Sequence, residues 1–127
     1  MAFTSDPFCN PLLFTLATQS VANATADVNI GGGNNVELRA FTATNTGGAA
    51  ATAYLKFWDA NSVVVGTTDP DFIFLIPAGQ TVQVVFQSST DAGVLFENGL
   101  TMAAVTTGGT GGTSNPADTI VVRLWII

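Results

Sequence analysis

The chain contains no histidine, one cysteine and only three basic residues among its 127 positions. The absence of histidine removes the commonest general base and metal ligand, together with every Ser-His or Cys-His nucleophile pair. Three scattered cations do not form the clustered basic face that binds phosphate groups, so nucleic acid and anionic membrane surfaces are not expected partners. No apolar run approaches the length of a membrane span.

The single cysteine, Cys9, excludes a disulfide within the chain. No basic neighbour or helix start activates its thiol, so we expect Cys9 to be a small buried apolar side chain. The first residues lack the basic region and the cleavage site of a signal peptide, which predicts synthesis in the cytoplasm. Residues 1–12 are expected to form an extended N-terminal arm.

Charge is scarce throughout the chain. Charged residues make up 9% of the positions and hydrophobic residues 47%, whereas about a quarter of a typical soluble domain is charged. A surface of Thr, Ser, Asn, Gln and Gly offers little electrostatic repulsion against a neighbouring chain. This composition favours self-association or a strong partner interface, with a soluble monomer that has an uncharged surface as the alternative.

Short segments of alternating apolar residues are separated by Gly, Pro, Asn and Asp along most of the chain. This pattern is typical of an all-β domain. About eight antiparallel strands are expected in a single β-sandwich spanning residues 1–127, jelly-roll-like or immunoglobulin-like in topology. Residues 107–118, rich in Gly and Thr, are expected to form a flexible loop.

Several strand boundaries follow from turn residues. Residues 14–30 predict two strands separated near Asn23, and residues 31–35 predict the next turn because Gly and Asn tolerate positive φ. Residues 62–66 are predicted as a short strand, and residues 77–79 as a turn.

Alternation also assigns faces to the strands. In the strand predicted at residues 36–44, Phe41 falls on the face opposite Val36, Leu38 and Ala40. In the strand that follows residue 79, Val82, Val84 and Phe86 alternate with Thr81, Gln83 and Val85. In the last strand, one wholly apolar face is predicted to be core and consists of Ile120, Val122, Leu124 and Ile126.

Three segments supply candidate interface residues. Residues 53–59 place amphipathic aromatic side chains opposite an apolar face, and residues 72–76 are apolar at every position, which fits a strand covered on both faces or one that meets another subunit. The outer face of the last strand carries Arg and Trp, which are enriched at interface anchors. The candidates are Tyr54, Trp58, Phe72, Phe74, Arg123, Trp125 and Ile127.

No catalytic residue, cofactor or metal ion is expected. A carboxylate pair of the glycosidase type is an alternative, but most of the nine acids lie in turn-like contexts, such as Asp6, Asp59 and Asp69. We expect them to accept hydrogen bonds from backbone N–H groups. Asp69 and Asp71 lack the remaining ligands of a calcium loop.

Five segments carry a resemblance to a known family. In order, they read AYLKFWD (53–59), LIPAG (75–79), VQVVF (82–86), FENGLTMAAVTTG (96–108) and IVVRLW (120–125). This order resembles the strand and turn signatures of small structural proteins of tailed bacteriophages, over residues 53–127.

The resemblance implies a virion component without enzymatic activity. For a chain this small, it implies a capsid decoration or cement protein that binds the major capsid protein or other virion proteins as a homo-oligomer, such as a trimer. The alternative is a tail, neck or fibre domain that contacts a host glycan, through Trp58 or Trp125, or another virion protein.

Overall fold

The computed structural model of the chain describes residues 15–86 and 93–127. Within these residues there are nine strands and no helix, arranged in two antiparallel sheets. This confirms the all-β sandwich, with one strand more than the eight or so expected. The expected arm at residues 1–12 and Cys9 lie outside the described residues. The strands are β1 (Thr15–Ala22), β2 (Asp27–Ile30), β3 (Val36–Asn45), β4 (Ala53–Asp59), β5 (Phe72–Ile76), β6 (Thr81–Val85), β7 (Val94–Phe96), β8 (Leu100–Val105) and β9 (Ile120–Ile126).

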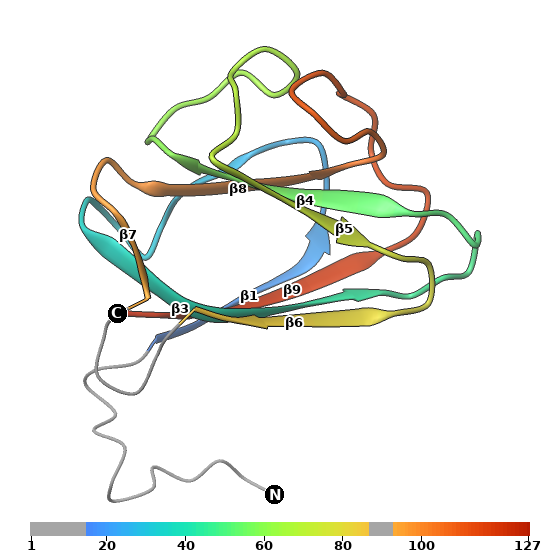
Figure 1. The fold of residues 1–127 in the computed structure, drawn as a ribbon, viewed down its shortest axis with the longest axis horizontal. Helices are drawn as coiled ribbons and strands as arrows, with labels where there is room; N and C mark the ends of the chain where they lie inside the picture. The colour runs from blue at the N-terminus through green and yellow to red at the C-terminus, as the bar shows by residue number, and fades with distance from the viewer. Residues whose placement is uncertain (1–14, 87–92) are drawn as a thin grey trace, which may run out of the picture.

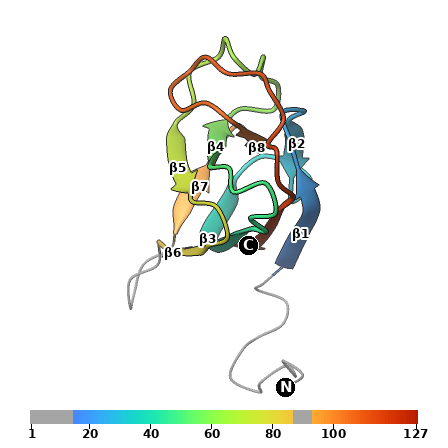
Figure 2. The same cartoon turned by 90° about the vertical axis from the view of Figure 1, so that its right-hand side faces the viewer.

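The order of the strands is that of a jelly roll. Sheet A has the order β1-β9-β3-β6, and the short β7 pairs with the first part of β3, where β6 pairs with its second part. Sheet B has the order β2-β8-β4-β5. The chain passes from one layer to the other at most connections, as the two stacked layers in Figures 1 and 2 show. Without β7, these are the eight strands of a double-sheet jelly roll, so the expected topology is confirmed.

The hydrophobic core lies between the two sheets, with side chains from both. Phe41 of β3 is at its centre and is fully buried. Its ring centroid lies 4.9 Å from that of Phe74 and 5.3 Å from that of Phe57, both in sheet B, and 6.1 Å from that of Phe86. Aromatic pairs at these distances add to the stability that burial alone provides. This cluster therefore joins the layers.

The connections at residues 23–26 and 31–35 form as expected from their turn residues. Asn23 ends β1, and its Oδ1 accepts the Thr25 N–H at 2.8 Å. Between β2 and β3, Gly31 and Gly32 have φ angles of +87° and +85°, and Asn35 has φ +59°. These are left-handed conformations that Gly and Asn adopt at little cost. The two predicted strands and the following turn are confirmed.

A bulge at Arg39 overturns one expected face. Leu38 pairs with Ile126 of β9, but Ala40 pairs with Trp125, so β3 has one extra residue between them. One inserted residue exchanges the two faces of a strand beyond that point. Phe41 consequently points into the core, and Ala40 lies on the outer face. The expectation that Phe41 and Leu38 lie on opposite faces of the strand is wrong, because the alternation does not continue through the bulge.

Residues 62–66 do not form the expected strand. The carbonyl oxygen of Val64 accepts the N–H groups of Thr67 and Thr68 at 3.0 and 2.8 Å. The hydroxyl of Thr68 accepts the Val64 N–H at 3.0 Å. The backbone groups that a strand would direct to a neighbour are here used within a local turn, so the strand prediction is wrong.

Strand β9 confirms the faces expected for the C-terminal segment. It lies between β1 and β3 in sheet A. Its inner side chains are at most 2% exposed, and all four belong to the core: Ile120, Val122, Leu124 and Ile126. Val82, Val84 and Phe86 likewise pack against the core, as expected for β6 and the residue that follows it.

Candidate assembly surfaces

Two loops of the chain itself cover the outer face of sheet B. They are residues 60–71 and 106–118, and both lie beyond sheet B in the two views of the ribbon (Figures 1 and 2). From the first loop, the Thr68 carbonyl oxygen accepts the indole N–H of Trp58 at 3.0 Å. Trp58 is 1% exposed as a result. The expectation that Trp58 is an interface residue is wrong, because its ring is already covered within the protomer.

The Gly/Thr-rich segment 107–118 packs closely on sheet B. A Cβ added at Gly108 would lie 3.0 Å from a Tyr54 ring carbon, closer than ordinary van der Waals contact, so the segment lies tightly against this ring. A Cβ added at Gly66 would lie 2.5 Å from the Thr113 methyl carbon, which shows that the two loops also touch each other. The segment expected to be a flexible loop thus serves as a lid over β4 and β8, and Tyr54 is half-buried beneath it.

Strand β5 presents a different pair of side chains to the outside than expected. Phe72 and Phe74 point inward and pack against the core, with the Phe72 ring centroid 6.2 Å from that of Phe96. The exposed residues of this edge strand are Ile73, at 39%, and Leu75, at 51%. Phe72 and Phe74 are partly buried against the core, and their expected role at an interface stays a prediction. The loops cover β4 and β8 but leave β5 accessible.

The outer face of sheet A is left uncovered by those two loops, as Figures 1 and 2 show. The register places four apolar side chains in one row across it, which we call the apolar row: Leu16, Trp125, Ala40 and Val85. Leu16 and Val85, at the ends of the row, are 53% and 61% exposed, and Trp125 is half-buried between Leu16 and Ala40. Among the expected interface residues, this face carries Arg123, Trp125 and Ile127.

A polar row runs beside the apolar row on the same face. Arg123 is exposed and lies between Thr18 and Thr42 in the register. On the other side of the apolar row, Leu95 is 49% exposed and Ile127 is 40% exposed. The face therefore combines exposed apolar side chains with one exposed cation, which is the composition expected of an interaction surface.

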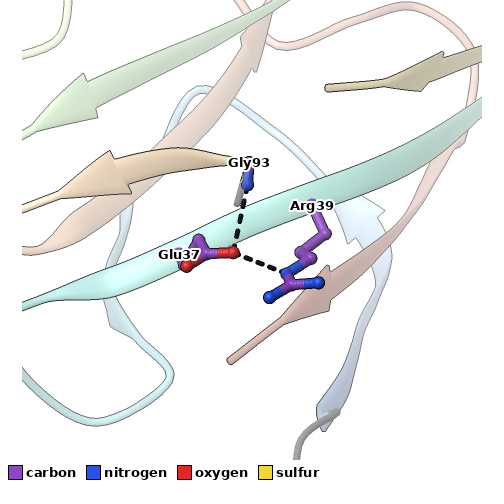
Figure 3. Close-up of polar contacts among 3 residues, drawn as sticks. All are labelled: Glu37, Arg39 and Gly93. Atoms are coloured by element: carbon purple, nitrogen blue, oxygen red, sulfur yellow. Dashed lines mark hydrogen bonds and ion pairs between the residues drawn. The ribbon is translucent and has the colours of Figure 1, made fainter. Parts of the chain in front are cut away.

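An ion pair fixes the β7 end of this face. Glu37 and Arg39 lie on β3, and Glu37 Oε1 accepts the Arg39 Nε–H at 2.5 Å (Figure 3). The same oxygen accepts the Gly93 N–H at 3.0 Å, which attaches the start of β7 to β3. Both side chains are about one-fifth exposed, at 18% for Glu37 and 21% for Arg39. Arg123, which is exposed, is the remaining charged side chain of this face among the described residues.

A groove of 320 Å³ lies between the edge strands β1 and β2. Its apolar floor includes Leu124 and Met102. At its rim, the Gln19 side-chain amide donates to both carboxylate oxygens of Asp27, at 3.0 and 2.9 Å. Asp27 is the only carboxylate in this lining, so the groove does not provide the second acid of a glycosidase pair.

The acids beside the sandwich ends act largely as acceptors for backbone N–H groups, as expected from their turn contexts. Asp59 accepts the Asn98 N–H at 2.7 Å, and Asp71 accepts the Asp59 N–H at 2.7 Å. Asp118, which is 8% exposed, accepts the N–H groups of Ala49 and Ala51. Asp69 instead accepts the Thr110 hydroxyl, and Asp6 lies outside the described residues.

Within residues 15–86 and 93–127, no three Cys, Asp or Glu side chains are grouped so as to hold a metal ion. The same residues contain no helix long and apolar enough to cross a membrane. Neither a protein-family model nor a curated protein sequence matches the chain.

Sequence reasoning missed most of the exposed apolar residues. Leu16, Val85 and Leu95 on sheet A, and Ile73 and Leu75 on β5, were not among the expected interface residues. A signal for the β5 pair was present, because every residue of FIFLI is apolar and one of its two faces must point away from the core. Which face that is depends on the pairing of β5 with β4.

The burial of Lys56 tests how completely residues 106–118 exclude water from the outer face of sheet B. Its side chain is fully buried, its Nζ donates to the Gly111 carbonyl oxygen at 3.4 Å, and burial lowers its pKa from the ordinary value of 10.5. The folded chain thus releases this proton at a lower pH than the unfolded chain. The free energy of unfolding should rise with pH between the lowered pKa and 10.5, and the contribution is unfavourable below that window.

We expect Lys56→Met to raise the free energy of unfolding near neutral pH by roughly 1 to 3 kcal/mol, because it removes a poorly compensated buried charge and keeps the length of the side chain. Urea unfolding measured from pH 7 to 10 should also lose its alkaline rise. Lys56→Arg is the control, since it keeps a charge that does not titrate there and should show neither gain nor rise. A less stable Lys56→Met variant would mean that the ammonium group is better compensated than the contact with Gly111 indicates.

Proposed function

We propose that the protein is a non-enzymatic structural component of a virion, and specifically a capsid cement or decoration protein. The observation that supports this is the contrast between the two outer faces of the jelly roll. Within residues 15–86 and 93–127, two loops cover sheet B, whereas the ends of the apolar row and Arg123 are exposed on sheet A. Exposed apolar side chains do not stabilise a monomer, whereas a subunit that docks on a neighbour buries them.

Three further features support the proposal. The order of segments in residues 53–127 resembles that of small structural proteins of tailed bacteriophages. The jelly roll is a fold used by viral capsid domains, although lectin domains and cupins share it and a fold alone does not define a function. The low charge of the chain leaves few groups whose desolvation would oppose docking.

The mechanism would be a shift of the assembly equilibrium. A protein that binds the assembled shell but not the loose subunits stabilises the shell by its binding free energy. The expected partner is the major capsid protein or another virion protein, and the chain would act as a homo-oligomer. The burial of Trp58 removes one of the two aromatic residues considered for a host glycan, which favours the cement role over a glycan-binding tail or fibre domain.

The copy number of the chain in purified particles tests this proposal. Quantitative mass spectrometry of washed virions should find hundreds of copies per particle, in a fixed ratio to the major capsid protein. A few to a few dozen copies would favour a tail, neck or fibre position. Absence of the chain from washed particles would contradict a virion role altogether.

Trp125→Ala tests the face itself. The side chain is half-buried in the middle of the apolar row, so its removal should weaken binding to shells at least tenfold and lower the melting temperature of the free protein much less. Binding is measured by co-sedimentation with shells that lack the protein. Val28→Ala, at a 48% exposed position on β2 outside sheet A, is the matched control and should bind as the natural chain does.

A further inference from the structure

Two exposed apolar surfaces of the chain differ in the sign of their charge. The first is the outer face of sheet A, with the apolar row and Arg123. The second, which we call the β5 surface, consists of Ile73 and Leu75 together with the neighbouring acids Asp59, Asp69 and Asp71.

The composition of the β5 surface follows from the pairing of β5 with β4. Ile73 lies opposite Lys56 and Leu75 opposite Tyr54, so both apolar side chains point to the outer side of sheet B. The acids lie at the end where β4 finishes and β5 begins, since the Asp71 carboxylate accepts the Asp59 N–H at 2.7 Å. The only cation of sheet B, Lys56, is fully buried and does not offset these charges at the surface.

The outer face of sheet A has the opposite balance. Among the described residues, its charged side chains are Glu37 and Arg39, which pair with each other, and the exposed Arg123. Six further acids of the described residues lie elsewhere: Asp27, Asp59, Asp69, Asp71, Glu97 and Asp118. Among the described residues, an exposed arginine thus lies on one apolar surface and three aspartates lie beside the other.

From this separation we infer that copies of the chain associate head to tail, with the outer face of sheet A of one copy against the β5 surface of the next. Contact of two sheet A faces would leave Arg123 without the aspartates of the β5 surface as partners, and contact of two β5 surfaces would bring those aspartates together. The head-to-tail contact pairs opposite charges and buries both apolar patches. Such a contact is heterologous, and it closes into a ring when the rotation between copies permits.

The inference deepens the proposed function, because it names the surfaces through which the homo-oligomer would form. It assigns the face of sheet A to the contact between copies, so Trp125→Ala would weaken binding to shells by dispersing the oligomer that binds them. It is tested on the purified chain without shells. A chain that stays monomeric in solution would therefore contradict this contact but not the binding to particles. Absence of the chain from particles would contradict the proposed function but not this contact.

Three matched substitutions separate the alternatives, each replacing an exposed apolar strand residue by glutamate. Val85→Glu, at a 61% exposed position, alters the face of sheet A, and Leu75→Glu, at a 51% exposed position, alters the β5 surface. Val28→Glu, at a 48% exposed position on β2, alters neither and serves as the control. Circular dichroism verifies that all three remain folded, as their exposure predicts.

Sedimentation velocity at low ionic strength should show an oligomer for the natural chain and for Val28→Glu, and a monomer for Val85→Glu and for Leu75→Glu alone. An equimolar mixture of the two monomeric variants should form a dimer and nothing larger, because Val85→Glu retains an intact β5 surface and Leu75→Glu an intact sheet A face. Arg123→Gln should weaken association of the natural chain and reduce its sensitivity to salt.

Each contrary result overturns the inference in a different way. An oligomer of Leu75→Glu as large as that of the natural chain would indicate contact between two sheet A faces. An oligomer of Val85→Glu would indicate that sheet A takes no part. Two monomeric variants that do not combine on mixing, or a natural chain that stays a monomer at every concentration tested, would rule out head-to-tail association.

Discussion

Deletion of residues 124–127 is expected to leave the chain unfolded in water. These residues end β9, which lies between β1 and β3 and pairs with both. The deletion removes the core side chains Leu124 and Ile126, which are 2% and 1% exposed. Each contributes about 1.5 to 3 kcal/mol by burial, and the hydrogen bonds to two neighbouring strands are lost as well. A domain of this size has a total stability of roughly 5 to 15 kcal/mol.

Far-ultraviolet circular dichroism of the truncated chain, and its unfolding in urea, measure this effect. Ile127→Thr is the control, because it changes a side chain that is 40% exposed and keeps the backbone bonds between Ile127 and Glu37, at 3.0 and 3.2 Å. The control should fold normally. A truncated chain with a cooperative unfolding transition would show that sheet A does not need the end of its central strand.

Phe41→Ala is expected to lower the free energy of unfolding by about 3 to 5 kcal/mol. Phe41 is fully buried and contacts aromatic rings of both layers, so its loss leaves a cavity that neither sheet fills. Thr42→Ala is the matched control at the next position of β3. Its side chain lies on the outer face beside Arg123, and its loss should cost within about 0.5 to 1 kcal/mol.

The difference between these two variants, measured by urea unfolding, tests the bulge at Arg39 directly. Unbroken alternation from Leu38 would place Thr42 inside and Phe41 outside. Equal losses for the two variants, or a larger loss for Thr42→Ala, would mean that β3 keeps its alternation and that the bulge is wrong.

The local properties of the sequence were sufficient for the fold class, many turns and the β9 core face. Asn23 and residues 31–35 mark connections because Asn and Gly adopt left-handed or turn conformations at low cost, a property of each residue that needs no distant partner. The faces of β9 followed from strict alternation in Ile120–Ile126, which no bulge interrupts. For the same reason Val82 and Val84 were placed correctly.

Other features were decided by the tertiary structure because they depend on segments distant in the chain. The bulge at Arg39 exists only in the pairing of β3 with β9, some eighty positions later, and it determined which side of β3 holds Phe41. The pairing of β5 with β4 determined that Phe72 and Phe74 face the core and that Ile73 and Leu75 remain exposed.

For the candidate interface residues too, the sequence determined some features and the tertiary structure determined others. Alternation alone placed Arg123 and Trp125 on the outer side of the last strand, and the structure places both on the uncovered face of sheet A. Trp58 has the same sequence character, an aromatic residue on the outer side of its strand, yet it is 1% exposed because residues 60–71 fold back over it. Strand periodicity determines which side of a sheet a residue occupies. Whether that side is covered depends on where distant loops pack, and only the tertiary structure decides it.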